Sequence, residues 1–490
     1  MTKSYITTTI PYVNGDLHLG HAQEFCEADS LARYHRLKGE DVLLSVGTDE
    51  NGEKNLESAE KAGITPKEYV DSKLPNVLAV QKAYGISADR FIRTSDEAHQ
   101  KRVQIIWKQL EPYLFKARYV GYYCVGCEEF KTETDFKEND GVCPDHNRKY
   151  EMRDDENYFF KLSAFGDKLK ELIESGELRV VPDSRKKEIL NFIGKGLQDQ
   201  SVSRPKEKLS WGVEVPGDPT QTIYIWSEAL MNYLTLLGYP EHDDYKKYWP
   251  ADVQVLGKGV LRFHAVIWPA MLLALGLPLP KELFVHGYIT ANGKKMSKSL
   301  GNSVDPLKVV ELFGQDASRY FLLAKISSYE DGDFTWKRML DSYNNDLLNG
   351  LGNVIQRTSM MISKYIGGDI GSGVPGIRHD HTVYHAAIKD YRFDKALEWV
   401  FGIVDGVNKY LEQTKPWMLA KDESNQEHVR EILLTCVADL REISDLLAPF
   451  MPQTSQMIKD VFGGAVLNPP QGPVFPRVEL PGELTAQGAA

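Results

Sequence analysis

The stretch SYITTTIPYVNGDLHLGHAQEFCEADSLARYHRLKG, residues 4–39, determines how the chain begins to fold. Residues 4–10 are rich in β-branched and aromatic side chains and end at Pro11, which predicts a buried strand. Residues 19–38 carry apolar side chains at helical spacing and precede Gly39, which predicts a helix that ends there. A strand followed directly by a helix is the repeating unit of a parallel sheet.

Further strands follow the same pattern along the chain. Residues 42–46, 253–256 and 283–290 are short apolar runs, and the last ends near the turn dipeptide Asn292-Gly293. A helical pattern follows residues 253–256 and continues to Leu275. The alternation predicts an α/β fold with a doubly wound, Rossmann-like parallel sheet, whose ligands bind beyond the carboxyl ends of the strands.

Two regions depart from this alternation. Residues 116–210 carry most of the cysteines and β-like segments at 158–162 and 178–181, which predicts an inserted module that splits the sheet domain. Residues 340–463 are helical almost throughout, apart from a Gly/Pro loop at 367–376, which predicts a helical bundle. Its expected apolar faces include Leu347, Leu351, Val354 and Ile355 on one helix and Leu433, Leu434, Val437 and Leu440 on another.

Composition sets the class of protein. A chain of 490 residues, 42% hydrophobic and 26% charged, is an ordinary globular protein with about two to four domains. We expect neither a signal peptide nor a membrane span, and the five cysteines favour a reducing, cytoplasmic compartment. The net charge of −11 argues against indiscriminate nucleic-acid binding. The basic residues between 179 and 208 are either a solvated surface, which we favour, or a local RNA-binding face.

PYVNGDLHLGH, residues 11–21, places two histidines where the first strand turns into a helix. A helix N-terminus has free backbone N–H groups and a positive dipole end, both of which suit phosphate. His18 and His21 can donate hydrogen bonds to phosphate oxygens, and Gly20 allows a flat ligand to approach the backbone. A structural histidine pair or two metal ligands are the alternatives for this motif alone.

KKMSKSLGN, residues 294–302, follows the last predicted strand. Lys295 and Lys298 can reach charge that builds up on a departing pyrophosphate and stabilise it electrostatically. By itself the motif would favour a solvated basic loop, but together with the histidine motif it indicates a phosphate site.

Cys124, Cys127, Cys143 and His146 have the C-x₂-C…C-x₂-H spacing of a tetrahedral zinc site. Four protein ligands leave no open coordination position, so we expect one Zn²⁺ with a structural role. Cys26 and Cys436 stand alone and are interpreted as buried thiols.

The ordered set of motifs resembles class I aminoacyl-tRNA synthetases, and methionyl-tRNA synthetases in particular. The likeness rests on PYVNGDLHLGH, KMSKS (295–299), GTDENG (47–52), FVHGYI (284–289) and IYIWSEAL (223–230), and it extends over residues 4–460. It implies that methionine reacts with Mg²⁺-ATP to give an adenylate and pyrophosphate, and that the methionyl group then passes to methionine tRNA. His18, His21, Lys295 and Lys298 would be the catalytic residues.

The resemblance also implies binding residues. Asp49 would bind the methionine ammonium and Arg204 would orient that carboxylate. The methionine side chain would lie among Ile10, Tyr12, Trp226, Ala229, Leu230, Tyr233, His264 and Ile267. ATP would be bound by Asn14, His18, Gly20, His21, Glu214, Gly257, Ile289 and Lys298.

One position departs from the family pattern. Gly259 stands where the family usually has an acidic residue for the ATP ribose, and losing that hydrogen bond costs on the order of 1–3 kcal/mol. Either another group such as Glu214 compensates, or ATP binds more weakly.

In the helical region, Asn353 and Arg357 share a helix face, and Trp417 lies near the end of another helix. From the residues alone, Trp417 is better interpreted as core. The resemblance instead implies that these three residues read the CAU anticodon, with Trp417 stacked on its first base.

We therefore expect a monomer with a catalytic domain at 1–115 and 211–290, a zinc-knuckle insertion at 116–210, a linker at 291–345, an anticodon-binding bundle at 346–465 and a tail at 466–490. Two alternatives remain. One is a synthetase for another apolar amino acid, and the other is an inactive tRNA-binding paralogue.

Overall fold

The computed structural model describes residues 2–126, 129–131, 133–144, 147–296, 302–371, 379–482 and 484, with only the backbone of Glu129 and Lys295. The chain divides into two compact units. The first contains residues 1–17, 40–79 and 88–285, and the second contains residues 18–39, 80–87 and 286–490.

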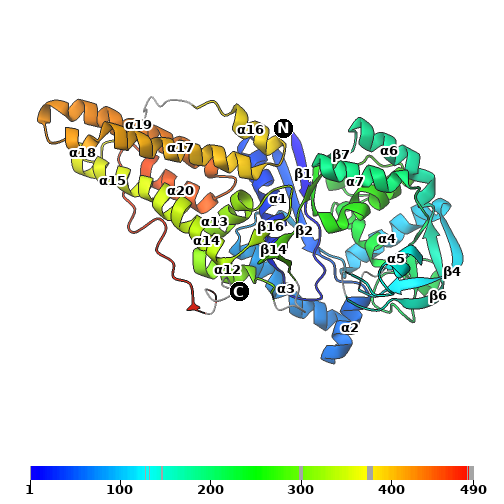
Figure 1. Cartoon of the computed structure of the whole chain (residues 1–490). Helices are drawn as coiled ribbons and strands as arrows, with labels where there is room; N and C mark the ends of the chain where they lie inside the picture. The colour runs from blue at the N-terminus through cyan, green and yellow to red at the C-terminus, as the bar shows by residue number, and fades with distance from the viewer. Residues whose placement is uncertain are drawn as a thin grey trace. The chain divides into compact units, whose positions relative to one another are not determined.

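The first unit contains the predicted parallel sheet, whose strand order is β3-β2-β1-β12-β13-β7 (Figure 1). Its strands are β1 (Lys3–Thr7), β2 (Asp41–Thr48), β3 (Arg90–Arg93), β7 (Arg179–Val181), β12 (Val253–Gly257) and β13 (Glu282–His286). β1 pairs in parallel with both β2 and β12. Tyr5, Ile6 and Leu44 are at most 1% exposed, as expected for strands covered on both faces. The Rossmann-like α/β prediction is confirmed.

The edge strand β7 corrects one expectation. The sequence predicts a strand at 178–181 but assigns it to the insertion, whereas β7 pairs in parallel with β13 in the main sheet. Local β-propensity indicates that a strand forms, but the pairing partner depends on contacts made more than 100 residues away along the chain.

The rest of the first unit consists of two small antiparallel sheets and the helices between them. β4 (Leu114–Cys124) and β6 (Glu151–Phe160) form a long pair flanked by β5 (Glu129–Lys131) and β8 (Gln200–Ser201) (Figure 1). β9 (Ser203–Pro205), β10 (Glu214–Val215) and β11 (Asp218–Ile223) form the other sheet. The helices are α2 (Glu53–Ala62), α3 (Pro66–Ala83, whose last turn belongs to the second unit), α4 (Glu97–Leu110), α5 (Glu133–Glu138), α6 (Gly166–Ser175), α7 (Asp183–Gly194), α8 (Ile225–Leu230), α9 (Asn232–Thr235), α10 (Asp243–Tyr248) and α11 (Trp268–Ala274).

The predicted strand at 283–290 is two strands. β13 ends at His286, and β14 (Ile289–Ala291) pairs with β15 (Lys294–Lys295) and β16 (Gly332–Phe334) in a separate sheet of the second unit. The break falls at Gly287, where a Cβ atom would lie 2.3 Å from the carbonyl oxygen of Glu330. Asn292 and Gly293 both have positive φ and form the tight turn between β14 and β15.

The second unit is otherwise helical, as the sequence predicts. Its helices are α1 (Leu19–Leu37), α12 (Pro306–Phe313), α13 (Gln315–Tyr320), α14 (Trp336–Ser342), α15 (Asn353–Ile366), α16 (Thr382–Lys389), α17 (Phe393–Thr414), α18 (Pro416–Leu419), α19 (Gln426–Leu447) and α20 (Pro452–Phe462), with π-helical backbone at 343–352. Leu347, Leu351, Val354, Ile355, Leu433, Val437 and Leu440 are fully buried, while Leu434 is half-buried.

The segment after α20 packs against this unit. Phe475 is 7% exposed, and the Tyr343 hydroxyl donates to the carbonyl oxygen of Pro476 at 2.6 Å. Part of the predicted loop, residues 372–376, lies outside the described residues.

Acidic side chains of α1 are buried and form ion pairs with side chains of the same unit. Asp29 lies 2.8 Å from Arg319, and neither side chain is exposed to solvent. Arg319 also donates to the carbonyl oxygens of Tyr84 and Phe450. An unpaired buried charge is costly, so this pairing allows α1 to be buried on all sides.

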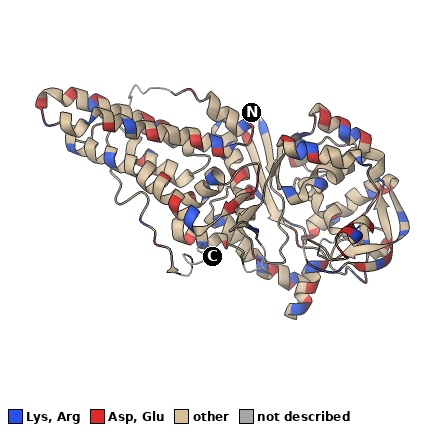
Figure 2. Ribbon diagram, in the orientation of Figure 1, with Lys and Arg blue, Asp and Glu red and all other residues tan. Residues whose placement is uncertain are grey.

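Positive and negative side chains are interspersed along the helices (Figure 2). In the basic stretch 179–208, Arg179, Arg185, Lys206 and Lys208 each pair with a carboxylate. These contacts favour the solvated-surface interpretation. Among the described helices, none is long and apolar enough to span a membrane.

Candidate active site

In the first unit, the segments that follow β1 and β2 run side by side at the carboxyl edge of the sheet. Tyr12 and Asp49 form a parallel bridge, in which the Asp49 N–H donates to the Pro11 carbonyl at 2.9 Å and the Val13 N–H donates to the Asp49 carbonyl at 3.2 Å. Asp49 is only 4% exposed, and the Thr94 hydroxyl lies 3.5 Å from its carboxylate. This backbone ladder holds the predicted ammonium-binding carboxylate next to Tyr12.

A buried polar network that the sequence did not predict adjoins Asp49. Glu50 accepts hydrogen bonds from Arg93 at 2.8 Å and from Ser95. The Asn51 amide donates to Glu228 at 3.2 Å, and Glu228 also pairs with His99. The acidic residues in the motifs GTDENG and IYIWSEAL could have indicated this network, because carboxylates are rarely buried without a partner.

The aromatic residues predicted for the methionine wall lie on α8, on α9 and in the π-helical turn at 263–267. The ring of Trp226 stacks on Phe263 with centroids 4.1 Å apart and an interplanar angle of 11°. The Tyr233 hydroxyl lies 2.7 Å from Nε2 of His264, whose Nδ1 lies 3.0 Å from the Val260 carbonyl. A carbonyl can only accept, so Nδ1 carries the proton and Nε2 accepts from Tyr233.

The remaining wall residues belong to the same unit. Ala229, Leu230 and Ile267 are buried, while Ile10 and Tyr12 are partly exposed. The sequence analysis missed Phe263, since a phenylalanine in an apolar run carries no signal distinguishing it from core. Phe263 and Ile267 also line a cavity of about 460 Å³ whose wall includes Phe192, Lys195 and Arg262.

Arg204 is 2% exposed on β9. Its guanidinium lies over the ring of Tyr224 at 4.2 Å and donates to the Ser201 hydroxyl at 2.9 Å and the Ser203 carbonyl at 2.7 Å. These contacts fix the orientation of the guanidinium plane. Its predicted action on Asp49 stays a prediction.

In the second unit, His18 and His21 form a reciprocal cap at the N-terminus of α1. The Gly20 N–H donates to Nδ1 of His18 at 3.1 Å, and the His18 N–H donates to Nδ1 of His21 at 3.2 Å. Their rings are stacked with centroids 4.0 Å apart. Because Nδ1 accepts in both rings, the proton of each neutral imidazole resides on Nε2, which makes Nε2 a hydrogen-bond donor.

A side chain at Gly20 would crowd this arrangement. A Cβ atom there would lie 3.0 Å from Cε1 and 3.1 Å from Nδ1 of the His18 ring. The first turn of α1 also contains no acidic side chain, so its positive dipole end is not neutralised from within the helix. The combination suits an anionic ligand.

The lysine motif is only partly described. Lys295 belongs to β15, but its side chain and the whole of Lys298 lie outside the described residues. The preceding turn is fixed by Asp333, which accepts from Gly293 N–H at 2.7 Å and from the Thr290 hydroxyl at 2.6 Å. Ile289 is 5% exposed on β14.

The other predicted nucleotide residues lie in the first unit. Asn14 is exposed, and its carbonyl accepts from the Tyr69 hydroxyl at 3.2 Å. Gly257 ends β12, and Gly259 is exposed in the 3₁₀ turn that follows. Glu214, the suggested substitute for an acid at Gly259, pairs with Lys206 at 2.6 Å. That ion pair competes with any contact to a ribose.

Two of the four predicted zinc ligands are described. Cys124 ends β4 and Cys143 precedes a tight turn, and both are at most 1% exposed. The Cys143 N–H donates to the Arg148 carbonyl at 2.8 Å, and Asn147 has a positive φ of 50°. Cys127 and His146 lie outside the described residues. Two buried thiols on a tight turn and a strand end fit a structural zinc site.

The predicted anticodon residues come from two helices. Asn353 and Arg357 lie on α15, and the Arg357 guanidinium is 5.4 Å from the ring centroid of Trp417 on α18. Trp417 is half-buried, so it is neither pure core nor fully exposed. Glu412, which the sequence analysis missed, accepts from Arg357 at 2.8 Å and holds it beside the indole.

Comparison with known proteins identifies the family. A family model described as tRNA synthetases class I (M) matches residues 4–150 and 139–359. The methionine–tRNA ligase of Caldanaerobacter subterraneus is 43% identical over 473 residues, covering 94% of this chain and 74% of that protein. The Bacillus subtilis methionine–tRNA ligase is 40% identical over 484 residues, covering 94% and 73%.

A solved structure agrees with this result. Mycobacterium tuberculosis methionyl-tRNA synthetase in complex with methionyl-adenylate superposes with a TM-score of 0.92 at 34% identity, covering 97% of this chain and 100% of that one. Identity, coverage and fold all support the same assignment. The chain belongs to the methionine–tRNA ligases, within the class I tRNA synthetases.

Proposed function

We propose that this chain activates methionine with ATP and transfers the methionyl group to methionine tRNA. The observation that carries the proposal is the burial of side chains assigned to methionine in the first unit: Asp49 is 4% exposed, and the buried Tyr233 hydroxyl lies 2.7 Å from Nε2 of His264. In the first step the methionine carboxylate attacks the α-phosphorus of ATP and pyrophosphate leaves. In the second step a 3′-terminal hydroxyl of tRNA attacks the adenylate carbonyl and AMP leaves.

In the proposed methionine site, Asp49 binds the ammonium group and the aromatic side chains surround the thioether. Sulfur–aromatic contacts contribute about 0.3–1.5 kcal/mol each, so such walls favour methionine over leucine or isoleucine. The hydrogen bond between Tyr233 and His264 restricts both side chains, which supports the proposal that the wall has a rigid polar edge. Homocysteine differs by one methyl group, worth about 1–3 kcal/mol, so we expect it to be activated at a reduced rate.

At the phosphates, His18 and His21 act as hydrogen-bond donors from Nε2, and Lys295 and Lys298 neutralise the charge that develops on pyrophosphate. The capping hydrogen bonds at Nδ1 support the donor role of both histidines. No side chain acts as a covalent nucleophile. Catalysis consists of orientation and electrostatic stabilisation.

Two metal ions belong to the proposal. Mg²⁺ accompanies ATP and shields its phosphate charge. One Zn²⁺ is held by Cys124, Cys127, Cys143 and His146, and it keeps the turns of the insertion folded. We place the insertion at 116–210 and the anticodon-binding bundle at 346–465.

For tRNA, we propose that Asn353, Arg357 and Trp417 read the CAU anticodon. The half-buried indole beside Arg357 supports this role, because one face can stack on a base while the other is braced. We further propose a cytoplasmic enzyme that works as a monomer.

The decisive experiment is methionine-dependent exchange of labelled pyrophosphate into ATP without tRNA, over a range of ATP concentrations. Exchange with methionine, and not with leucine, isoleucine or valine, is the expected result. If half-maximal exchange needs a high ATP concentration, we attribute this to Gly259, and Gly259→Glu should then lower the ATP concentration needed. Absence of exchange at saturating ATP, from folded and zinc-loaded protein, would contradict the enzymatic proposal and leave a tRNA-binding paralogue.

A further inference from the structure

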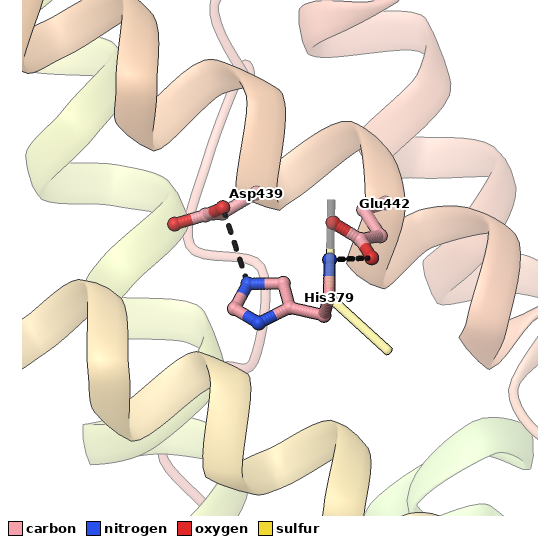
Figure 3. Close-up of side chains that lie close together, drawn as sticks. All are labelled: His379, Asp439 and Glu442. Carbon is pink, nitrogen blue, oxygen red and sulfur yellow. Dashed lines mark hydrogen bonds and ion pairs between the residues drawn. The ribbon is translucent and has the colours of Figure 1, made fainter. Parts of the chain in front are cut away.

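A cluster of histidines and carboxylates lies in the helical unit, outside every residue assigned above. His379 precedes α16, whereas Asp439 and Glu442 are one turn apart on α19. Figure 3 shows the three side chains drawn together between these segments. One ligand atom from each residue lies within 4.8 Å of the other two. More than 50 residues of chain separate the histidine from the carboxylates, so only the tertiary structure brings them together.

The distances suit a metal ion. Nε2 of His379 lies 3.4 Å from Oδ1 of Asp439. Two ligands about 2.0–2.1 Å from a tetrahedral zinc ion lie about 3.4 Å apart, which is the same separation. Both of these atoms are buried, and they contact each other as an ion pair.

The third carboxylate is oriented by its surroundings. Glu442 accepts from the backbone N–H of His379 at 3.3 Å and also pairs with Nε2 of His381. Residues that ligate a metal are commonly held by such outer hydrogen bonds. His381 in turn packs edge-on against Trp399, with centroids 5.3 Å apart. His381 therefore orients Glu442 from outside the cluster.

We propose that His379, Asp439 and Glu442 form a second divalent-metal site, distinct from the cysteine site and occupied by Zn²⁺. One imidazole and two carboxylates suit zinc, with a solvent molecule completing a tetrahedron. Bound metal would cross-link the start of α16 to α19 and so stabilise the folded second unit. This inference does not rest on the proposed enzymatic function.

The test uses the full-length protein loaded with Co²⁺ in place of zinc. Metal stoichiometry is measured by mass spectrometry and the ligand type by absorption, since cobalt bound to thiolates shows charge-transfer bands that histidine and carboxylate ligands do not give. Wild type is expected to hold two equivalents per chain, only one with thiolate bands. His379→Gln and Asp439→Asn are each expected to lose one equivalent and keep those bands.

The matched control is His428→Gln, which removes a histidine that pairs with Glu431 on the surface of the same helix α19. It is expected to bind as much cobalt as wild type. If the cysteine site were absent, wild type would hold one equivalent without thiolate bands, and the present proposal would still stand. Wild type with thiolate-bound metal only, or His379→Gln with undiminished stoichiometry, would overturn it.

Discussion

His18 and His21 illustrate how a backbone contact sets the chemistry of a side chain. Each Nδ1 accepts a backbone N–H at the start of α1, so each Nε2 carries the proton and is a hydrogen-bond donor in the neutral ring. The cap and the proposed catalytic function therefore use different nitrogens of the same ring. A substitution can therefore remove the proposed catalytic donor and keep the helix cap.

We expect His21→Asn to keep the cap and lose the donor, because an asparagine oxygen can take the position of Nδ1 but nothing replaces Nε2. Pyrophosphate exchange should fall by about 10²–10³ in kcat, the usual cost of removing one transition-state donor. The thermal midpoint should hardly change. Steady-state exchange kinetics and a melting curve check this, and His21→Gln, which returns a donor near Nε2, should recover part of the rate. Equal activity of both variants and wild type would contradict the role of Nε2.

At the scale of elements, α1 is a helix whose acidic residues are buried because the second unit supplies cations. Burial raises the pKa of Asp29, but Arg319 and Arg33 outweigh it, so that its pKa is lowered overall. Arg319 is fully buried and donates to three carbonyl oxygens as well. The pair joins α1 and α13 through one guanidinium.

Arg319→Met should destabilise the protein by about 3–5 kcal/mol, since it removes the fully buried cation that neutralises the Asp29 charge. Urea unfolding measures the effect. Lys337→Met is the matched control, because it removes an exposed ion pair with Asp341 and should cost less than about 1 kcal/mol. Similar midpoints for the two variants would rule out a structural role for the buried pair.

His286, in the motif FVHGYI, forms a second buried pair with α1. Burial lowers its pKa, but the carboxylates of Glu27 and Glu24 outweigh this and raise the pKa to about 9. Nε2 lies 3.2 Å from Glu24 and Nδ1 lies 2.8 Å from the Gly287 carbonyl, so both ring nitrogens donate and the imidazolium is favoured.

Because the folded pKa of His286 is higher than the unfolded value of about 6.5, its contribution to stability is complete below about pH 6.5. It is lost as the pH rises through 9. We expect an NMR titration to show a histidine that stays protonated until about pH 9, with its signal assigned by its absence in His286→Gln. The urea midpoint should also be lower at pH 9.5 than at pH 6.5. A His286 signal that titrates near pH 6.5 would contradict the buried ion pair.

At the scale of the whole molecule, the residues proposed for methionine and those proposed for the anticodon belong to different compact units. Asp49 and Trp226 lie in the first, and Arg357 and Trp417 lie in the second. Activation without tRNA and recognition of tRNA should therefore respond to different substitutions.

Trp417→Ala should lower kcat/KM for methionine tRNA by about 5- to 150-fold, the equivalent of about 1–3 kcal/mol of lost base stacking. Pyrophosphate exchange without tRNA should be unchanged. Aminoacylation assays with tRNA and exchange assays without it make the comparison. Met418→Ala, next to it and 52% exposed, is the control and should leave both reactions intact. A loss of exchange in Trp417→Ala would indicate that the indole is core.

The sequence by itself determined the features that depend on local pattern. Short apolar, β-branched runs predicted β1, β2 and β12, and apolar residues at helical spacing predicted α1 and the helical second unit. The motifs indicated the family through residues close together in the chain, such as His18 and His21 or Cys124 and Cys127. The catalytic, methionine-binding, ATP-binding, zinc and anticodon assignments all remain predictions.

Only the tertiary structure decided which distant residues meet. It paired β7 with β13, separated β13 from β14 at Gly287, and placed Phe263 on Trp226, Arg319 on Asp29 and His379 beside Asp439. These contacts join residues 37 to 290 positions apart, and no local periodicity specifies a partner at that distance. They form because burying a charge or an edge strand is favourable only where the rest of the fold supplies its complement.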